Sequence, residues 1–163
     1  MNKLLILIIL LLSTNCYASD ILLYARAEIG KGETIANNRG EVIKLYNRGF
    51  EGAWCAGFVS YILDKAGFKD LGYSLSAKQI YNRAKALNLI TDKARAGDLI
   101  VFWRESKKSW KAHIGIVEKI EGNYIHTIEG NVGDYPSVVK RIKYNKNNIP
   151  KLLGFIKINR AIE

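Results

Sequence analysis

The pattern of apolar residues changes near residue 97, and this change limits the possible folds more than any other feature of the chain. Before it, apolar side chains recur at the three- and four-residue spacing of helices with one buried face. After it, short apolar runs of strand length are separated by turn residues. Helices followed by antiparallel strands are typical of an α+β domain in which the helices pack against one face of the sheet.

The positions of the elements follow from this spacing and from capping residues. A capping box at Ser76-Ala77-Lys78-Gln79 and a glycine at position 67 mark helix ends. We expect helices at residues 20–30, 41–47, 54–66 and 76–87, and strands at residues 99–103, 114–120, 124–129, 137–142 and 152–158. The prediction is a roughly five-stranded antiparallel sheet covered by N-terminal helices, in one domain that spans residues 19–163.

The composition supports a single globular domain and excludes several other classes. The 163 residues suffice for one compact domain but are too few for two ordinary ones. Apolar residues make up 48% and charged residues 25%, a balance found in globular rather than disordered chains. With only two cysteines and two histidines, a zinc-ribbon cluster is not expected. We therefore expect no metal and no cofactor.

The first eighteen residues have the organisation of an export signal. Lys3 supplies a positive charge, residues 4–12 form an unbroken apolar run, and Cys16-Tyr17-Ala18 offers small residues at a cleavage site. The run is too short to span a bilayer, which takes about 20 residues. We predict a signal peptide at residues 1–18 and a periplasmic or secreted mature protein with no stable membrane insertion. A buried N-terminal helix or strand and a lipidated Cys16 are the alternatives.

Cleavage after residue 18 would leave Cys55 as the one cysteine of the mature chain. Structural cysteines in an oxidising compartment come in pairs, so a lone thiol there is either buried and inert or chemically employed. Cys55 is expected in the first turn of the helix at 54–66, where unpaired backbone N–H groups and the helix dipole stabilise a thiolate. This placement favours a nucleophile whose pKa is lowered.

The chain has two histidines that could act as a base, and strand parity separates them. Glu129 and Asn131 lie two residues apart, so they share one face of the expected strand. His126 lies three residues before Glu129 and should point to the opposite face. We therefore expect His126 at an exposed or core-edge position, and we assign the role of base to His113.

The position of His113 relative to these residues depends on the turn between two strands. With a three-residue turn at 121–123, His113 faces Asn131 and Gly115 faces Glu129 on the neighbouring strand. A two-residue turn would shift the register by one residue and break this arrangement. The prediction that His113, Glu129 and Asn131 share one face therefore rests on the length of the turn.

These residues predict nucleophilic hydrolysis of an amide. His113 would hold the proton taken from Cys55, forming a thiolate–imidazolium pair, and would later protonate the leaving amine. Glu129 or Asn131 would accept a hydrogen bond from the other ring nitrogen and fix the tautomer. The backbone N–H of Cys55, at the helix start, is a natural donor to the oxyanion of the tetrahedral intermediate. The amide would be hydrolysed through a thioester.

Four short segments carry these residues in a fixed order. They are Trp54-Cys55-Ala56-Gly57-Phe58-Val59, Gly97-Asp98-Leu99-Ile100-Val101-Phe102-Trp103, His113-Ile114-Gly115-Ile116-Val117 and Glu129-Gly130-Asn131. Together they resemble the CHAP family, the cysteine, histidine-dependent amidohydrolases/peptidases, which are related to NlpC-type wall peptidases and more distantly to papain. The resemblance runs from about residue 37 to residue 155.

The resemblance to the CHAP family implies both a fold and a reaction. It implies a papain-like α+β fold and cleavage of peptidoglycan, at the sugar–peptide amide or within the stem or cross-bridge peptide. It also implies Cys55 as nucleophile, His113 as base and Glu129 as orienting acid, with Asn131 in support.

Three tryptophans lie close to these segments in the sequence. Trp103 and Trp110 bound a basic loop that leads to His113, and Trp54 precedes the nucleophile. We expect all three to bind substrate, because loops near catalytic strands often carry binding residues. A solvated loop with one buried tryptophan, and a Trp54 that only packs, are the alternatives.

The formal charge of +10 suits an anionic partner such as the cell wall. It would also suit nucleic acid, but no nucleic-acid motif is present, so we expect peptidoglycan as partner and no nucleic acid. The setting stays open between remodelling of the producer's own wall and bacteriolytic attack on competitors. An immunity or inhibitor protein is a further partner expected in the second setting.

Two other functions remain compatible with the sequence. The first is a cysteine peptidase or amidase that acts on non-wall substrates. The second is a non-catalytic wall-binding module that retains the fold. The complete set of Cys55, His113, Glu129 and Asn131 argues against the second function.

Overall fold

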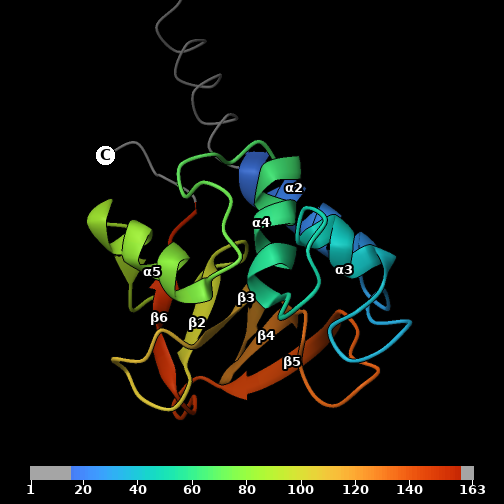
Figure 1. Cartoon of the computed structure of the whole chain (residues 1–163). Helices are drawn as coiled ribbons and strands as arrows, with labels where there is room; N and C mark the ends of the chain where they lie inside the picture. Colours follow the sequence, from blue (N-terminus) through green and yellow to red (C-terminus); the bar gives the residue numbers. More distant parts are fainter. Residues whose placement is uncertain (1–15, 159–163) are drawn as a thin grey trace, which may run out of the picture.

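The computed structural model describes residues 16–158, and in it helices cover one face of a curved sheet (Figure 1). The helices are α2 (Cys16–Ala27), α3 (Glu41–Tyr46), α4 (Cys55–Lys65) and α5 (Ala77–Ala86). The strands are β1 (Ile90–Thr91), β2 (Leu99–Trp103), β3 (Ala112–Glu121), β4 (Tyr124–Glu129), β5 (Lys140–Asn145) and β6 (Leu152–Ile156). All paired strands are antiparallel, in the order β1-β6-β2-β3-β4-β5. The expected α+β class is confirmed.

The sheet has six strands where roughly five were expected. The additional strand is β1, a two-residue edge strand that pairs with β6. So short a strand has too few residues to show a period-two pattern, and this explains why sequence periodicity did not reveal it.

The strand expected at 137–142 begins later, because the first part of that segment has a different partner. The backbone N–H of Glu33 donates to the carbonyl oxygen of Ser137 at 2.9 Å, and Gly32 forms a β-bridge with Val138. The Glu33 carboxylate also accepts the backbone N–H of Ser137 at 2.9 Å. Residues 137–139 are thus bound to the loop after α2, and pairing with β4 begins only at Lys140.

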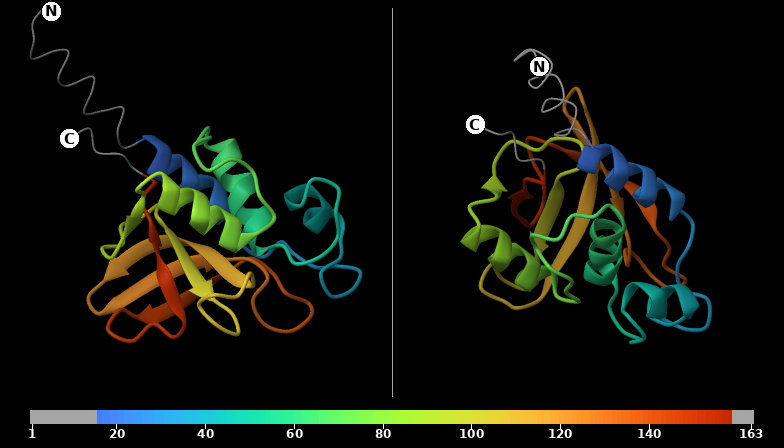
Figure 2. Two further views of the ribbon diagram at one scale, coloured as in Figure 1. Left: turned by 60° about the vertical axis from the view of Figure 1, so that its left-hand side comes forward. Right: turned by 90° about the horizontal axis from the view of Figure 1, so that it is seen from above.

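The sheet is buried on both faces around β2. On the helix side, Leu99 and Val101 belong to the main core together with residues of α4. On the other side, Ile100 and Phe102 form a second cluster with Val117 and other residues. A strand with two buried faces reads as a continuous apolar run, as residues 99–103 do. Figure 2 shows α2, α4 and α5 side by side over the first of these faces.

The helix α5 begins at the expected capping box, in a modified form. The Ser76 side chain accepts the backbone N–H of Gln79 at 3.3 Å, as a capping serine should. The Gln79 side chain accepts the hydroxyl of Ser74 at 2.7 Å, and Ser74 Oγ accepts the backbone N–H of Ser76 at 3.0 Å. A second serine therefore bridges the two ends of the box.

The hairpin of β3 and β4 closes differently from the expectation. Its turn has two residues, 122–123, instead of three. A β-bulge after Val117 leaves Glu118 without a paired residue, and beyond the bulge Val117 pairs with Thr127. An extra residue in a strand changes the register as an extra residue in the turn would. The expected turn length was wrong, and the bulge restores the register that the longer turn would have produced near the site.

The predicted signal peptide lies mostly outside the described residues. Residues 16–18, at its expected end, form the beginning of α2, which starts earlier than the helix expected at 20–30. The ring of Tyr17 packs edge-on against Phe68, with 5.9 Å between centroids. Within residues 16–158, no helix is both long enough and apolar enough to cross a membrane.

Candidate active site

The helix α4 begins at Cys55, and its N-terminal end lies against β3 and β4 (Figure 1). Cys55 is a free cysteine and is 8% exposed. Burial alone would raise the pKa of its thiol. The charge and hydrogen bond of His113, together with hydrogen bonds from the backbone of Ile114 and Ala56, outweigh burial and lower the pKa below its ordinary value of 9.0. These contacts stabilise a thiolate at the helix start.

His113 lies at the beginning of β3 and is almost fully buried. Its Nε2 atom is 2.8 Å from Oε2 of Glu129, which leaves Nδ1 as the nitrogen available to the Cys55 sulfur. Burial would lower the pKa of the imidazole. The neighbouring thiolate and carboxylate reverse this effect and raise the pKa to about 9. The environment therefore favours a thiolate–imidazolium pair at neutral pH.

Glu129 is fully buried at the end of β4 and accepts hydrogen bonds from more than one partner. Thr127 Oγ1 donates to its Oε1 at 2.5 Å, and the Tyr144 hydroxyl also bonds to the carboxylate. Burial and the nearby carboxylate raise the pKa of Tyr144, so this hydroxyl keeps its proton and stays a donor. The carboxylate is thus held by donors on β4 and β5 while it faces the imidazole of His113.

A glycine on the neighbouring strand makes room for this carboxylate. A Cβ atom at position 115 would lie 2.5 Å from Cγ and 3.1 Å from Cδ of Glu129. Gly115 therefore faces Glu129, as the expected register required, and any larger residue would displace the acid. A glycine in a strand interior often marks such a close approach, and this signal was present in the sequence.

Of the two residues that could orient His113, the structure places Glu129 at the ring. Asn131 follows β4 with a left-handed backbone, φ 61°, and is half-buried. The Nε2 atom of His113 is already bonded to Glu129, so Asn131 is not the partner of that nitrogen. The supporting role of Asn131 stays a prediction.

Trp54 does not line a cleft as predicted, because it is completely buried. Its ring covers Gly130 and stacks near Tyr46, with 5.9 Å between ring centroids. Its Nε1–H donates to the buried Glu33 carboxylate at 3.1 Å. Trp54, which precedes the nucleophile, therefore packs against Gly130, the residue after Glu129. The expected contact with substrate is wrong for this side chain.

The two other tryptophans are differently exposed. Trp103 is half-buried at the end of β2, and Trp110 is 75% exposed in the loop that precedes β3. Trp103 lines a pocket of about 170 Å³, together with His113, Glu129 and Tyr144. Trp103 is therefore in a position to contact a ligand near the site, and the binding roles of both residues stay predictions.

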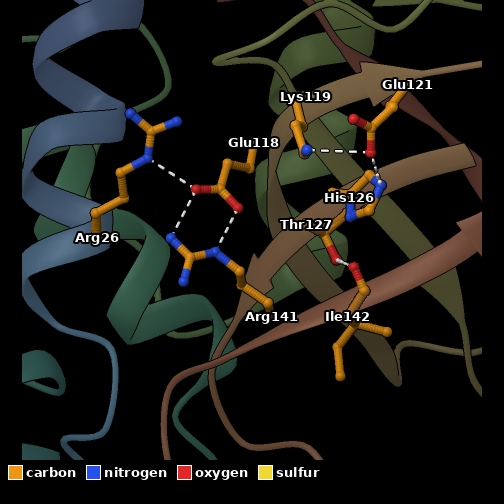
Figure 3. Close-up of polar contacts among 8 residues, drawn as sticks. All are labelled: Arg26, Glu118, Lys119, Glu121, His126, Thr127, Arg141 and Ile142. Atoms are coloured by element: carbon orange, nitrogen blue, oxygen red, sulfur yellow. Dashed lines mark hydrogen bonds and ion pairs between the residues drawn. The ribbon is translucent and has the colours of Figure 1, made fainter.

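His126 lies apart from the site, as strand parity indicated. Its Nε2 atom is 3.2 Å from Oε2 of Glu121, near the turn of the hairpin (Figure 3). His113 is therefore the one of the two histidines that contacts Cys55. Among residues 16–158, no cluster of three or more His, Cys, Asp and Glu residues is arranged to hold a metal ion.

Three residues around the site were missed by sequence reasoning. They are Thr127 and Tyr144, which hold Glu129, and Glu33, which holds Trp54. Thr127 could have been found, because it shares a strand face with Glu129. Tyr144 and Glu33 reach the site from distant segments, and nothing in their local sequence indicates this.

Comparison with known proteins assigns the chain to a family. The family model of the CHAP domain matches residues 46–131, which is more than half of the chain and includes Cys55, His113, Glu129 and Asn131. The chain belongs to the CHAP domain family. No curated protein matches it in sequence.

Two solved structures share the fold. The crystal structure of Ly7917 has a TM-score of 0.57 and 18% sequence identity, and the match covers 85% of this chain and 61% of that one. The crystal structure of Ly7917 with the hydrolyzing product of MDP has a TM-score of 0.54, with 18% identity over 85% and 61% of the two chains. The chain thus spans less than two thirds of the length of the matched protein. At this identity the likeness shows that the two chains share a fold.

Proposed function

We propose that this protein is an exported, cysteine-dependent peptidoglycan hydrolase that cleaves an amide bond of the cell wall, as an amidase or an endopeptidase. The observation that carries the proposal is the buried arrangement of Cys55, His113 and Glu129 in a chain of the CHAP family. Ly7917, which shares the fold, has been crystallised with the hydrolyzing product of MDP, and this supports hydrolysis as the reaction.

The first half of the proposed reaction forms a thioester. The Cys55 thiolate attacks the carbonyl carbon of the amide, and a new C–S bond forms as the carbonyl electrons move to oxygen. The backbone N–H of Cys55, at the start of α4, donates to that oxyanion. His113 transfers the proton on Nδ1 to the leaving nitrogen, the C–N bond breaks, and an amine leaves.

The second half releases the acid product. Neutral His113 removes a proton from a water molecule, which attacks the thioester carbonyl and forms a C–O bond. The C–S bond then breaks, the carboxylic acid leaves, and the thiolate–imidazolium pair is regenerated. Glu129 keeps the His113 ring in one orientation through both halves of the reaction. Its carboxylate bonds to Nε2 of the ring and is itself fixed by hydrogen bonds from Thr127 and Tyr144.

Digestion of purified sacculi tests this function. The wild-type protein should release soluble muropeptides and free amino groups without new reducing sugars, and mass spectrometry of the products identifies the bond that is cut. Cys55→Ala and His113→Ala should abolish release. His126→Ala removes the other histidine and should retain activity. Full activity in Cys55→Ala would contradict the assigned nucleophile. If sacculi stay intact while a non-wall peptide is cleaved, the protein is a hydrolase whose substrate is not peptidoglycan.

Export is a separate part of the proposal. The order of charge, apolar run and small residues in positions 1–18 supports a cleaved leader. Expression of the full chain with its own N-terminus in a bacterium should yield a protein outside the cytoplasm whose mass corresponds to a start at Ser19. An uncleaved chain that remains in the cytoplasm would contradict export without affecting the hydrolase proposal.

A further inference from the structure

His113, Glu129 and Tyr144 form one part of the wall of the pocket described above, and the proposed reaction does not use the other lining residues. The other lining residues are the apolar or aromatic Phe102, Trp103, Val132 and Pro150 and the cationic Arg104 and Lys151. The volume of about 170 Å³ is below the roughly 300–1,000 Å³ of sites that enclose a whole drug-sized ligand. The pocket therefore has room for a single substituent of a larger substrate.

The two cations are brought together by the ends of neighbouring strands. The backbone N–H of Trp103, at the end of β2, donates to the carbonyl oxygen of Lys151 at 2.9 Å. The ammonium group of Lys151 lies 5.6 Å from the centroid of the Trp103 ring, and Arg104 follows Trp103 in the chain. Lys151 thus lies beside the Trp103 ring, and Arg104 lines the same pocket.

Neither cation is neutralised within the described part of the chain. The ion pairs found there include neither Arg104 nor Lys151. The carboxylate next in sequence, Glu105, is bonded to Lys111 and Ser109. The carboxylate in the pocket wall, Glu129, already accepts bonds from His113 and other donors. The pocket therefore has two positive charges without an ion-pair partner in the described residues, and its one carboxylate, Glu129, is already bonded to other side chains of the protein.

The pocket is also close to the reacting sulfur. The imidazole of His113 bonds with Cys55 on one side and with Glu129 on the other, and both His113 and Glu129 line the pocket. His113 thus contacts the sulfur and also lines the pocket. A substrate held at Cys55 could place a neighbouring substituent there.

We propose that this pocket is a subsite that binds a carboxylate of the substrate, so that the enzyme prefers amides of acidic peptides. The inference rests on the proposed hydrolase function and specifies its substrate class. Arg104 can form paired hydrogen bonds with a planar carboxylate, and Lys151 adds a point charge. The apolar part of the wall would contact the methylene groups that carry the acid.

A matched pair of substrates tests the subsite. One is a synthetic wall peptide with a free carboxylate on the residue beside the scissile amide, and the other carries a carboxamide at that place. Wild-type kcat/KM should be higher for the acidic peptide by roughly 10- to 100-fold, the effect expected of a hydrogen-bonded charge. Arg104→Gln/Lys151→Gln should remove this preference. Lys85→Gln/Lys93→Gln, which removes two exposed charges elsewhere, should retain it.

A binding measurement separates the subsite from the reaction. In a Cys55→Ala background, calorimetry should show tighter binding of the acidic peptide than of the amidated one, and Arg104→Gln/Lys151→Gln should abolish the difference. If no peptide is cleaved but this difference is present, the hydrolase proposal fails and the subsite stands. Equal binding of the two peptides to the protein with intact Arg104 and Lys151 would overturn the subsite. Inhibition by inorganic phosphate without a preference between the peptides would also overturn it.

Discussion

Glu118 and Glu129 are both buried carboxylates of the β3–β4 hairpin, and they differ in their partners. Glu118, at the bulge, is bound by Arg26 and Arg141 through contacts of 2.7–2.9 Å (Figure 3). Glu129 is bound by His113, Thr127 and Tyr144, of which only the imidazole can gain or lose a proton near neutral pH. The two arginines stay charged, so their ion pairs with Glu118 can only stabilise the fold. The imidazole of His113 can titrate, so the pair that it forms with Glu129 can take part in proton transfer.

The difference in partners also has an electrostatic consequence at Glu118. Hydrogen bonds from Arg141 and Arg26 exceed the effect of burial and lower the pKa of Glu118 from 4.5 to about 2. Glu118 therefore stays charged throughout the physiological range and joins α2 to β3 and β5. We infer that substitution of Glu129 will change the reaction, and that substitution of Glu118 will change stability.

Among substitutions at the two carboxylates and at the glycine beside Glu129, Glu129→Gln should have the largest effect on catalysis. The amide group would present N–H or a weaker acceptor to Nε2 of His113, so the ring would lose the bond that fixes its orientation. We expect kcat to fall roughly 10²- to 10⁴-fold, the range typical of positioned acid–base groups. Steady-state kinetics on wall fragments measure this effect, and circular dichroism verifies the fold. Activity within a few-fold of the wild type would show that Glu129 does not orient the base.

Gly115→Ala should affect the same acid from the opposite strand. The added methyl group would meet Glu129 Cγ at 2.5 Å and push the carboxylate away from His113. We expect a loss of roughly 10- to 100-fold in kcat from this misplacement, with about 1–3 kcal/mol of destabilisation from overpacking. Gly122→Ala, in the open hairpin turn, is the control and should leave kcat unchanged. Equal activities of the two variants would contradict the close contact.

Glu118→Gln should lower stability and leave the reaction of the folded protein intact. The substitution removes one charge from between two arginines whose side chains are about half exposed. Because solvent screens such partners, we expect a loss of about 1–3 kcal/mol in the free energy of unfolding. Chemical denaturation measures this loss, and kcat per folded molecule should equal that of the wild type. A large fall in kcat would mean that the bulge positions the site.

The contribution of Glu118 should also depend on pH. Its pKa in the folded protein is about 2, below its ordinary value of 4.5, so the charged form is stabilised by folding. The stabilisation is complete above the ordinary pKa and is lost as the pH falls toward the folded value. The difference in unfolding free energy between the wild type and Glu118→Gln should therefore shrink between about pH 5 and about pH 2. A constant difference would contradict the ionic origin of this bond.

Strand parity predicted much of the site from sequence, because the alternation of side chains holds wherever a strand is regular. It placed Glu129 on the face of His113 and placed His126 elsewhere. It could not predict the bulge at Glu118, whose carboxylate bonds to Arg26 and Arg141 in distant segments. The predicted alignment was correct even so, because the shorter turn and the bulge compensate each other.

The misplacement of Trp54 has a similar cause. The sequence shows an aromatic residue beside a nucleophile, and this pattern is equally compatible with a cleft and with a core. Its burial is decided by Glu33 and by Gly130, which lie far from it in sequence. The helices and most strands could be predicted because their signals are local. The partners of buried polar groups could not, because tertiary contacts select them.

The pH dependence of Cys55 alkylation tests the central claim most directly, namely that His113 ionises this thiol. Iodoacetamide modification of Cys55, followed by peptide mass spectrometry, should proceed at full rate well below the ordinary pKa of 9.0. His113→Ala should shift the profile to higher pH, because burial then acts without the imidazolium, whereas His126→Ala should leave it unchanged. A wild-type profile that rises only near the ordinary value, or one that His113→Ala does not shift, would contradict the account.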